Sequence, residues 1–109
     1  MPAAQYDITI EQGVDYHLDI SWLDSENAAM PLDDYEFASQ VREDYASPSA
    51  MSFELEVADD LISLHAPSSS TSALDFSFGV WDLEATHTAS GEVVRLVQGR
   101  AEISREVTR

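Results

Sequence analysis

Strict alternation of apolar and polar residues is the feature that most constrains the fold of this chain. It is cleanest between Val14 and Trp22, where every second residue is apolar and the residues between them are polar. Five alternations in a row place the apolar side chains on one face of an extended segment. A helix would need an apolar repeat of about 3.6 residues, so this segment predicts a half-buried β-strand.

The same period recurs in short segments along the rest of the chain, separated by turn-forming residues. Together with 14–22, the expected strands are 6–11, 35–42, 53–57, 62–66, 76–85 and 94–103. Ala58-Asp59-Asp60 is expected to be the turn of a hairpin, and 44–50 and 67–72 are expected to be loops. A change of parity at Gly79 predicts a bulge, and a break is expected at Gln98-Gly99.

About seven short strands without a helical period predict an antiparallel sandwich or a small barrel. A length of 109 residues suits one domain, here 1–109, with a short N-terminal arm at 1–5 and a C-terminal arm at 104–109. The residues expected to be mainly buried between two sheets are Ile8, Ile10, Tyr16, Leu18, Ile20, Trp22, Phe37, Val41, Phe53, Leu55, Ile62, Leu64, Trp81, Leu83, Leu96 and Ile103.

Charge in this chain is strongly biased and unevenly distributed. There are 21 acidic residues and five arginines, which gives a net charge of −16. Residues 1–90 carry 18 of the acids and a single arginine, whereas residues 91–109 carry the other four arginines. An acidic surface of this kind repels nucleic acid phosphates and favours partners with basic patches. No direct binding of nucleic acid is therefore expected.

The sequence contains no recognisable motif for catalysis or cofactor binding. It has no cysteine, no G-x-S-x-G nucleophile motif, no phosphate-binding loop and no calcium-binding loop. The pairs Asp33-Asp34 and Asp59-Asp60 fall in expected turns, where aspartate bonds the local backbone. Nothing in the spacing of His17, His65 and His87 suggests that they converge on a metal. We expect no enzymatic activity, no catalytic or metal-binding residue and no cofactor.

Four aromatic residues, Tyr16, Trp22, Phe78 and Trp81, could form a sugar-stacking platform. Their strand parity favours burial in the core instead. No apolar run approaches the ~20 residues of a membrane-spanning helix, and the first residues lack the basic and apolar regions of a secretory signal. We expect a soluble chain that is made in the cytoplasm and does not contact a membrane.

Five short segments occur in order along nearly the whole chain. They are Ile-Thr-Ile-Glu-Gln-Gly at 8–13, Pro-Leu-Asp-Asp-Tyr at 31–35 before a strand ending in Gln-Val-Arg at 40–42, Trp-Asp-Leu-Glu at 81–84, Arg-Leu-Val-Gln-Gly at 95–99, and Ile-Ser-Arg-Glu-Val-Thr-Arg at 103–109. In their order and spacing these segments resemble a family of small virion structural proteins of tailed bacteriophages. The chain departs from that family at Asp33-Asp34, where relatives usually have Thr-Gly, and at Arg105, where they have proline. The first half is also similar, more weakly, to the N-terminal domain of upper baseplate proteins.

This resemblance implies a single antiparallel immunoglobulin-like β-sandwich of about seven strands, without catalysis and located in the virion. The expected function is that of an adaptor in the tail, baseplate or fibre-attachment region, in contact with other phage structural proteins and with copies of itself. Exposed strand edges and the two termini would make these contacts. A capsid decoration protein, a carbohydrate-binding sandwich that contacts the host surface and an acidic inhibitor that mimics DNA are the alternatives.

The arginines of the C-terminal segment are the candidate partner contacts, because a guanidinium group binds carboxylates in bidentate geometry. Arg95 is expected to pair with an acidic residue of its own domain. The chain end is expected to be ordered as far as residue 108 or 109, unlike a free tail. The residues expected to contact a neighbouring subunit are Arg100, Arg105, Glu106 and Arg109.

Overall fold

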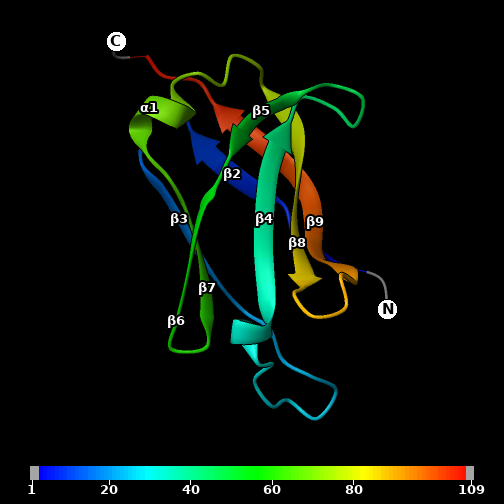
Figure 1. Ribbon diagram of the computed structural model, residues 1–109. Helices are drawn as coiled ribbons and strands as arrows, with labels where there is room; N and C mark the ends of the chain where they lie inside the picture. Colours follow the sequence, from blue (N-terminus) through cyan, green and yellow to red (C-terminus); the bar gives the residue numbers. More distant parts are fainter. Residues whose placement is uncertain (1–2, 108–109) are drawn as a thin grey trace.

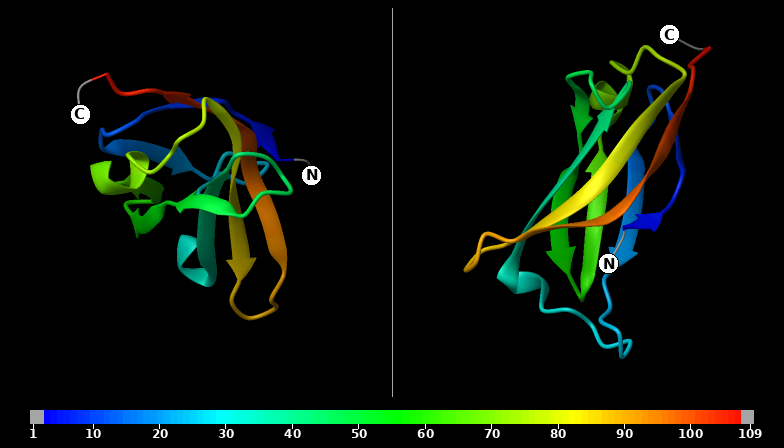
Figure 2. Two further views of the ribbon diagram at one scale, coloured as in Figure 1. Left: turned by 90° about the horizontal axis from the view of Figure 1, so that it is seen from above. Right: turned by 90° about the vertical axis from the view of Figure 1, so that its right-hand side faces the viewer.

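The computed structural model describes residues 3–107, which form two β-sheets packed face to face (Figures 1 and 2). The larger sheet has the strand order β1-β9-β8-β4-β5, and β2 pairs with the same edge of β9 as β1. Its strands are β1 (Ala4–Gln5), β2 (Ile8–Glu11), β4 (Tyr35–Arg42), β5 (Ser49–Ser52), β8 (Phe78–His87) and β9 (Val93–Ser104).

The smaller sheet has the strand order β3-β7-β6. Its strands are β3 (Tyr16–Ser21), β6 (Glu54–Ala58) and β7 (Leu61–Ala66). Two short helical turns complete the described secondary structure, a 3-10 helix at Leu32–Asp34 and α1 at Ser68–Thr71. β6 and β7 form the predicted hairpin, whose turn is Asp59-Asp60 with positive φ at both residues. This is the geometry of a type I′ turn, which matches the twist of the two strands.

The strand order identifies the kind of sandwich. In immunoglobulin domains one sheet contains B-E-D and the other C-F-G; here β3-β7-β6 corresponds to the first and β4-β8-β9 to the second. The predicted immunoglobulin-like β-sandwich is confirmed. The larger sheet is mixed rather than purely antiparallel, because β1 and β2 run parallel to β9. The chain continues from β2 into the opposite sheet, so no hairpin fixes the direction of β2.

The core lies between the sheets and is built from the alternating inward residues of both. All of the residues predicted to be buried belong to this core or pack against it. Those that are buried are Ile8, Ile10, Val41, Phe53, Ile62, Leu64, Trp81, Leu83 and Ile103. Those that are only partly buried are Tyr16, Leu18, Ile20, Trp22, Phe37, Leu55 and Leu96.

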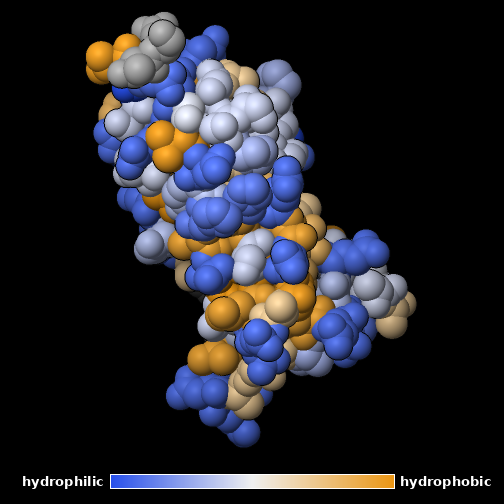
Figure 3. All heavy atoms as spheres, turned by 90° about the vertical axis from the view of Figure 1, so that its left-hand side faces the viewer, coloured by the Kyte–Doolittle hydropathy of each residue, from blue (hydrophilic) through white to orange (hydrophobic). Residues whose placement is uncertain are grey.

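Four of the partly buried residues lie toward one end of the sandwich, which we call the open end: Ile20, Trp22, Phe37 and Leu96. This end carries the Asp59-Asp60 turn and the 23–31 loop (Figure 1), and its inner residues include Val57, which like Ile20 pairs with Ile62. β5 pairs only with the far end of β4, at Gln40–Arg42, so β4 beside Phe37 has no neighbour on that side. Val57 on edge strand β6 is 38% exposed, and Figure 3 shows hydrophobic side chains gathered across this part of the molecule.

Four local predictions were wrong. The expected loop 44–50 gives way to β5 at its end, and the expected loop 67–72 contains the helical turn α1. Gly79 is not a bulge; it is a buried, regularly paired residue of β8 that faces inward. Glycine is needed there because a Cβ would collide with the backbone oxygen of Arg42. β9 is unbroken at Gln98-Gly99, and its irregularity is a bulge at Leu96, where the partners of Leu83 and Glu84 are Val97 and Arg95.

Candidate functional site

The bulge at Leu96 shapes the outer face of the larger sheet. Residues on one face of a regular strand are an even number of positions apart, yet Arg95 and Gln98 are three apart and both lie on the outer face. The extra residue Leu96 allows this, because it shifts the register by one position. Arg95 therefore stands opposite Glu84, and Gln98 stands opposite Asp82.

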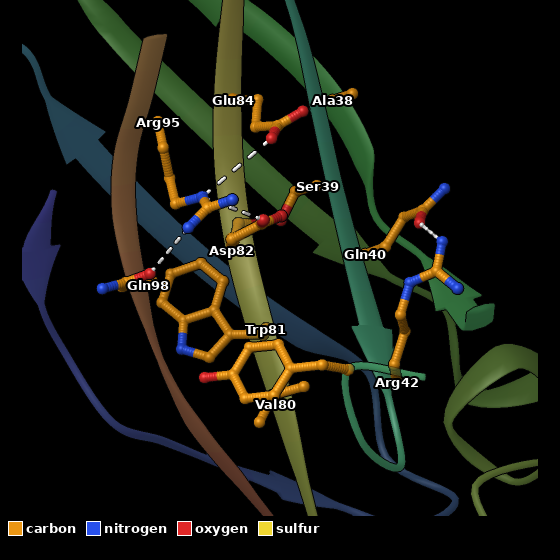
Figure 4. A pocket seen from close by; sticks show the side chains of 11 residues that line it. Ala38, Ser39, Gln40, Arg42, Val80, Trp81, Asp82, Glu84, Arg95 and Gln98 are labelled. Atoms are coloured by element: carbon orange, nitrogen blue, oxygen red, sulfur yellow. Dashed lines mark hydrogen bonds and ion pairs between the residues drawn. The ribbon is translucent and has the colours of Figure 1, made fainter. Parts of the chain in front are cut away.

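Small side chains hollow out this outer face between longer ones. Ala38 lies opposite Glu84, and Val80 lies opposite Arg42, so both short residues have long neighbours. The hollow that results has a volume of about 250 Å³ and is lined by residues of β4, β8 and β9 together with Tyr45 of the following loop. Figure 4 shows the polar side chains around it.

Two arginines organise the polar groups of the hollow (Figure 4). Arg42 donates from Nη2 to Gln40 Oε1 at 2.9 Å and from Nη1 to the carbonyl oxygen of Ser47 at 2.6 Å. Arg95 donates from Nη1 to Gln98 Oε1 at 3.0 Å. The expected pairing of Arg95 within its own domain is present, since its Nε lies 3.5 Å from Asp82 Oδ2.

Asp82 occupies the centre of the hollow and is partly shielded from water. Desolvation and the neighbouring carboxylate of Glu84 raise the pKa of Asp82 above its ordinary value, and the guanidinium groups of Arg95 and Arg42 offset only part of this rise. Arg95 Nε lies 4.0 Å from Glu84 Oε2 as well. Two carboxylates and two guanidinium groups thus leave the hollow nearly neutral within a chain of net charge −16.

The alternation places Gln40 and Asp82 on outward strand positions and Gln98 at the expected break in the last strand, but it does not bring the three together. Gln40, Asp82 and Gln98 come from three of the segments that resemble phage structural proteins, and they form one row across β4, β8 and β9. Alternation indicates which face a residue occupies, whereas the register between strands decides which residues become neighbours. The sequence carried no direct signal for the bulge at Leu96.

The four aromatic residues considered for a sugar-stacking platform do not form one. Trp81 is 3% exposed, and Tyr16 and Trp22 pack against the core. Phe78 is 53% exposed, so the prediction that it is a core residue was wrong. β8 turns Gly79 inward and therefore Phe78 outward, where the guanidinium carbon of Arg100 lies 5.1 Å from the ring centroid.

Two of the three histidines lie together on the outer face of the smaller sheet. His17 and His65 are cross-strand partners with stacked rings whose centroids are 4.4 Å apart. Glu54 Oε1 lies 3.6 Å from His65 Nδ1. His87 is elsewhere, with its Nδ1 at 3.0 Å from the Ser90 hydroxyl. Within residues 3–107 no group of three or more histidine, aspartate or glutamate side chains is arranged to hold a metal ion.

The predicted partner contacts lie at separate places. Arg100 covers Phe78 on the outer face of β9. Arg105 and Glu106 follow β9 near the β2–β3 turn: Arg105 Nη1 donates to the Asp75 carbonyl oxygen at 3.4 Å, and the Glu106 backbone N–H donates to a side chain of this turn at 2.9 Å. Arg109 and the expected order of the last two residues lie outside the described residues.

No helix in the described part of the chain is long and apolar enough to cross a membrane.

No family model matches the chain, and no curated protein matches it. Among solved structures, the chain is similar to an extracellular fragment, including the stalk region, of novel immune-type receptor 11 from Ictalurus punctatus. The two are 12% identical with a TM-score of 0.43, and the match covers 100% of this chain and 89% of that chain. The immunoglobulin-like assignment therefore rests on the strand order of the two sheets.

Proposed function

We propose that this chain is a non-enzymatic structural protein of a tailed-bacteriophage virion. It would act as an adaptor in the tail, baseplate or fibre-attachment region, through contacts with other structural proteins and with copies of itself. The resemblance of its segments to such proteins suggests the class. The immunoglobulin-like sandwich is compatible with it, although the same fold carries many unrelated functions.

The open end is the observation that supports subunit docking best. Its inner residues Ile20, Phe37 and Val57 remain partly exposed in the isolated chain. The flanking strands β3 and β6 are the two edges of the smaller sheet, and unpaired strand edges with exposed apolar side chains are docking sites for other chains. Burial of this end against a neighbour would complete the core. The acidic surface favours a neighbour with basic groups.

The proposal is tested with a phage-producing strain in which the gene is deleted and supplied again from a plasmid. Val57→Glu places a charge at the open end, on a residue already 38% exposed, so the isolated chain should stay folded. We expect gradient-purified particles to contain far less of this variant than of the wild-type chain. Tyr45→Glu is the matched control, because Tyr45 is 83% exposed in the loop after β4, away from both the open end and the C-terminal segment (Figure 1).

Wild-type particles that lack the chain, or full yields of infectious particles without the gene, would overturn the proposal. Immunogold labelling of the particles locates the chain and separates an adaptor in the tail from a capsid decoration protein. A chain truncated after Ser104 tests the C-terminal contacts: its incorporation should fall at low salt, and its difference from the wild-type chain should shrink at high salt, because salt screens the ion pairs that the wild-type chain makes.

A further inference from the structure

The smaller sheet ends at β6, and one side of this strand is unpaired. The chain passes from the larger sheet to the smaller one at Phe53, whose backbone N–H donates to the Ser39 carbonyl oxygen at 3.0 Å. Beyond Phe53, β6 pairs with β7 alone among the described residues. In Figure 1, β6 and β4 diverge from this crossing toward the Asp59-Asp60 turn. The side of β6 that faces away from β7 is therefore a free strand edge.

The hairpin turn determines which backbone groups β6 presents at this free edge. Ala58 and Leu61 are the first and last residues of the turn and partners in the ladder, so they form a hydrogen-bonded pair. Bonded and non-bonded pairs alternate along an antiparallel ladder. Leu55 and Val57 lie an odd number of positions from Ala58, so their N–H and C=O groups point away from β7. The free edge thus presents two donors and two acceptors to a partner strand.

The side chains of β6 differ between its two faces. Leu55 and Val57 face the inside of the sandwich, and Val57 is 38% exposed. Glu54 and Glu56 face outward, and the side chain of Glu54 is 68% exposed although its Oε1 lies 3.6 Å from His65 Nδ1. The strands β3, β6 and β7 contain no lysine or arginine. A neighbour at this edge would therefore meet apolar side chains on one face and carboxylates on the other.

A hollow of about 370 Å³ continues from these carboxylates across the outer face of the smaller sheet. Ser63 on β7 lines this hollow between its two cross-strand partners, Glu56 on β6 and Asp19 on β3. The short side chain of Ser63 leaves room above it. A long cationic side chain that enters from the β6 edge would lie between two carboxylates, which favours a charge-assisted contact.

We propose that β6 accepts an extended segment of a partner protein as a fourth, antiparallel strand of the smaller sheet. The segment carries arginine or lysine opposite Glu54 and Glu56 and apolar residues opposite Leu55 and Val57, because directly opposed residues share a face of the sheet. This proposal rests on the docking role proposed above and specifies the chemistry of the partner. The same edge of a second copy does not fit, since the glutamates of both copies would meet on one face.

Nitrogen-15 NMR of the full chain with synthetic peptides tests the proposal. The probe is an acetylated and amidated seven-residue peptide of alternating arginine and valine, added to about 5 mM against an expected Kd on the order of 0.5 mM. We expect saturable shifts of the backbone amide signals of Leu55 and Val57 and slower exchange of both protons with solvent, because each gains an acceptor. The signals of β3, the other edge of the sheet, should not change.

Three comparisons separate strand addition from general attraction between charges, all at about 0.15 M salt. A peptide of the same composition with its arginines and valines in separate blocks should bind about tenfold more weakly. N-methylation of the valines keeps every charge but removes the N–H groups that face β6, so binding should be lost. Glu54→Gln with Glu56→Gln should weaken binding of the alternating peptide about fivefold, since exposed ion pairs have small effects. Glu11→Gln with Glu102→Gln removes the same charge from the larger sheet and should leave the Kd nearly unchanged.

The proposal is overturned if the alternating peptide shifts neither Leu55 nor Val57, if the shifts fall on β3 instead, or if the N-methylated peptide binds equally well. These outcomes are distinct from a failure of the structural role. If Val57→Glu still lowers incorporation into particles, docking at the open end stands and only strand addition is wrong.

Discussion

The indole Nε1–H of Trp81 donates a 2.8 Å hydrogen bond to the backbone carbonyl oxygen of Tyr6, which lies 75 residues earlier in the chain. Tyr6 separates β1 from β2, so this bond fastens both N-terminal strands to the centre of the larger sheet. Gly99 lies beneath the same carbonyl, and a Cβ at Gly99 would approach it to 2.1 Å. The indole ring therefore packs in the core and also holds the only parallel strands among residues 3–107.

Trp81→Phe tests this role of the indole nitrogen. The phenyl ring keeps most of the buried surface, but the Tyr6 carbonyl loses its partner, so we expect a loss of about 1–2 kcal/mol in the free energy of unfolding. Urea unfolding measures the loss. Trp22→Phe is the control, because the ring of Trp22 contacts Tyr35 edge-on with centroids 4.7 Å apart, and Phe can keep this contact. A larger loss for Trp22→Phe than for Trp81→Phe would contradict the interpretation.

The turn of the β6–β7 hairpin can be made more stable by one substitution. Asp59 and Asp60 have φ of 53° and 62°, and glycine adopts such angles without the steric cost that other residues carry. We expect Asp60→Gly to stabilise the chain by about 0.5–1 kcal/mol. Asp60→Ala removes the same carboxylate but keeps a Cβ, so it should not stabilise. Equal melting temperatures for the two variants would show that charge, and not backbone conformation, is responsible.

Asp82 should make stability depend on pH in an unusual direction. Because desolvation and Glu84 raise its pKa above the ordinary value of 3.8, the folded chain retains a proton over a range where the unfolded chain has lost it. The contribution of Asp82 to stability therefore falls as the pH rises from 3.8 through the raised pKa. Asp82→Asn should raise the melting temperature at pH 7, and this gain should shrink towards zero at about pH 3.

Asp7 provides the opposite case in the same sheet. Its pKa is lowered, first because its Oδ1 accepts the backbone N–H of Arg100 at 2.9 Å and then because Gln5 donates to the same oxygen. The stabilisation from Asp7 is fully present above pH 3.8, the ordinary pKa of an aspartate, and disappears as the pH falls through the lowered pKa of the folded chain. Asp7→Asn should lower the melting temperature at pH 7 but not at pH 2. If Asp82→Asn and Asp7→Asn change the melting temperature in the same direction at pH 7, the general repulsion between acidic residues dominates over these local effects.

The period-two pattern predicted most of the fold because it reports which face of a strand is buried. The alternation from Tyr16 to Trp22 and from Phe37 to Val41 recurs as inward side chains in the structure. The pattern does not report how well the two sheets cover each other. Trp22 and Phe37 face inward and are nevertheless only partly buried, because the neighbouring edges of the sheets end short of the open end.

The candidate site could not be predicted because it depends on register. The resemblance drew attention to the segments 40–42, 81–84 and 95–99, but alternation alone could not place Gln98 opposite Asp82. The bulge at Leu96 changes the parity of the last strand two residues before the break expected at Gln98-Gly99. For the same reason the stacking of His17 on His65 was not foreseen, since it requires the pairing of β3 with β7.

The segment after β9 is attached to the domain by a hydrogen bond to Gln12 and by a longer one, of 3.4 Å, from Arg105 Nη1 to the Asp75 carbonyl oxygen. Gln12 accepts the backbone N–H of Glu106 at its Oε1, and its Nε2 donates to the Leu74 carbonyl oxygen at 2.7 Å. Truncation after Ser104 removes the bond to Glu106 and the long, exposed bond from Arg105, so we expect the chain to remain folded and to lose about 1 kcal/mol. Gln12→Ala removes both bonds of the Gln12 side chain and leaves the carbonyl of the buried Leu74 without this donor, so it should cost about 2–3 kcal/mol. Chemical denaturation of both variants distinguishes the two contributions. If truncation is as costly as Gln12→Ala, residues 105–109 contribute more to the fold than these two hydrogen bonds provide.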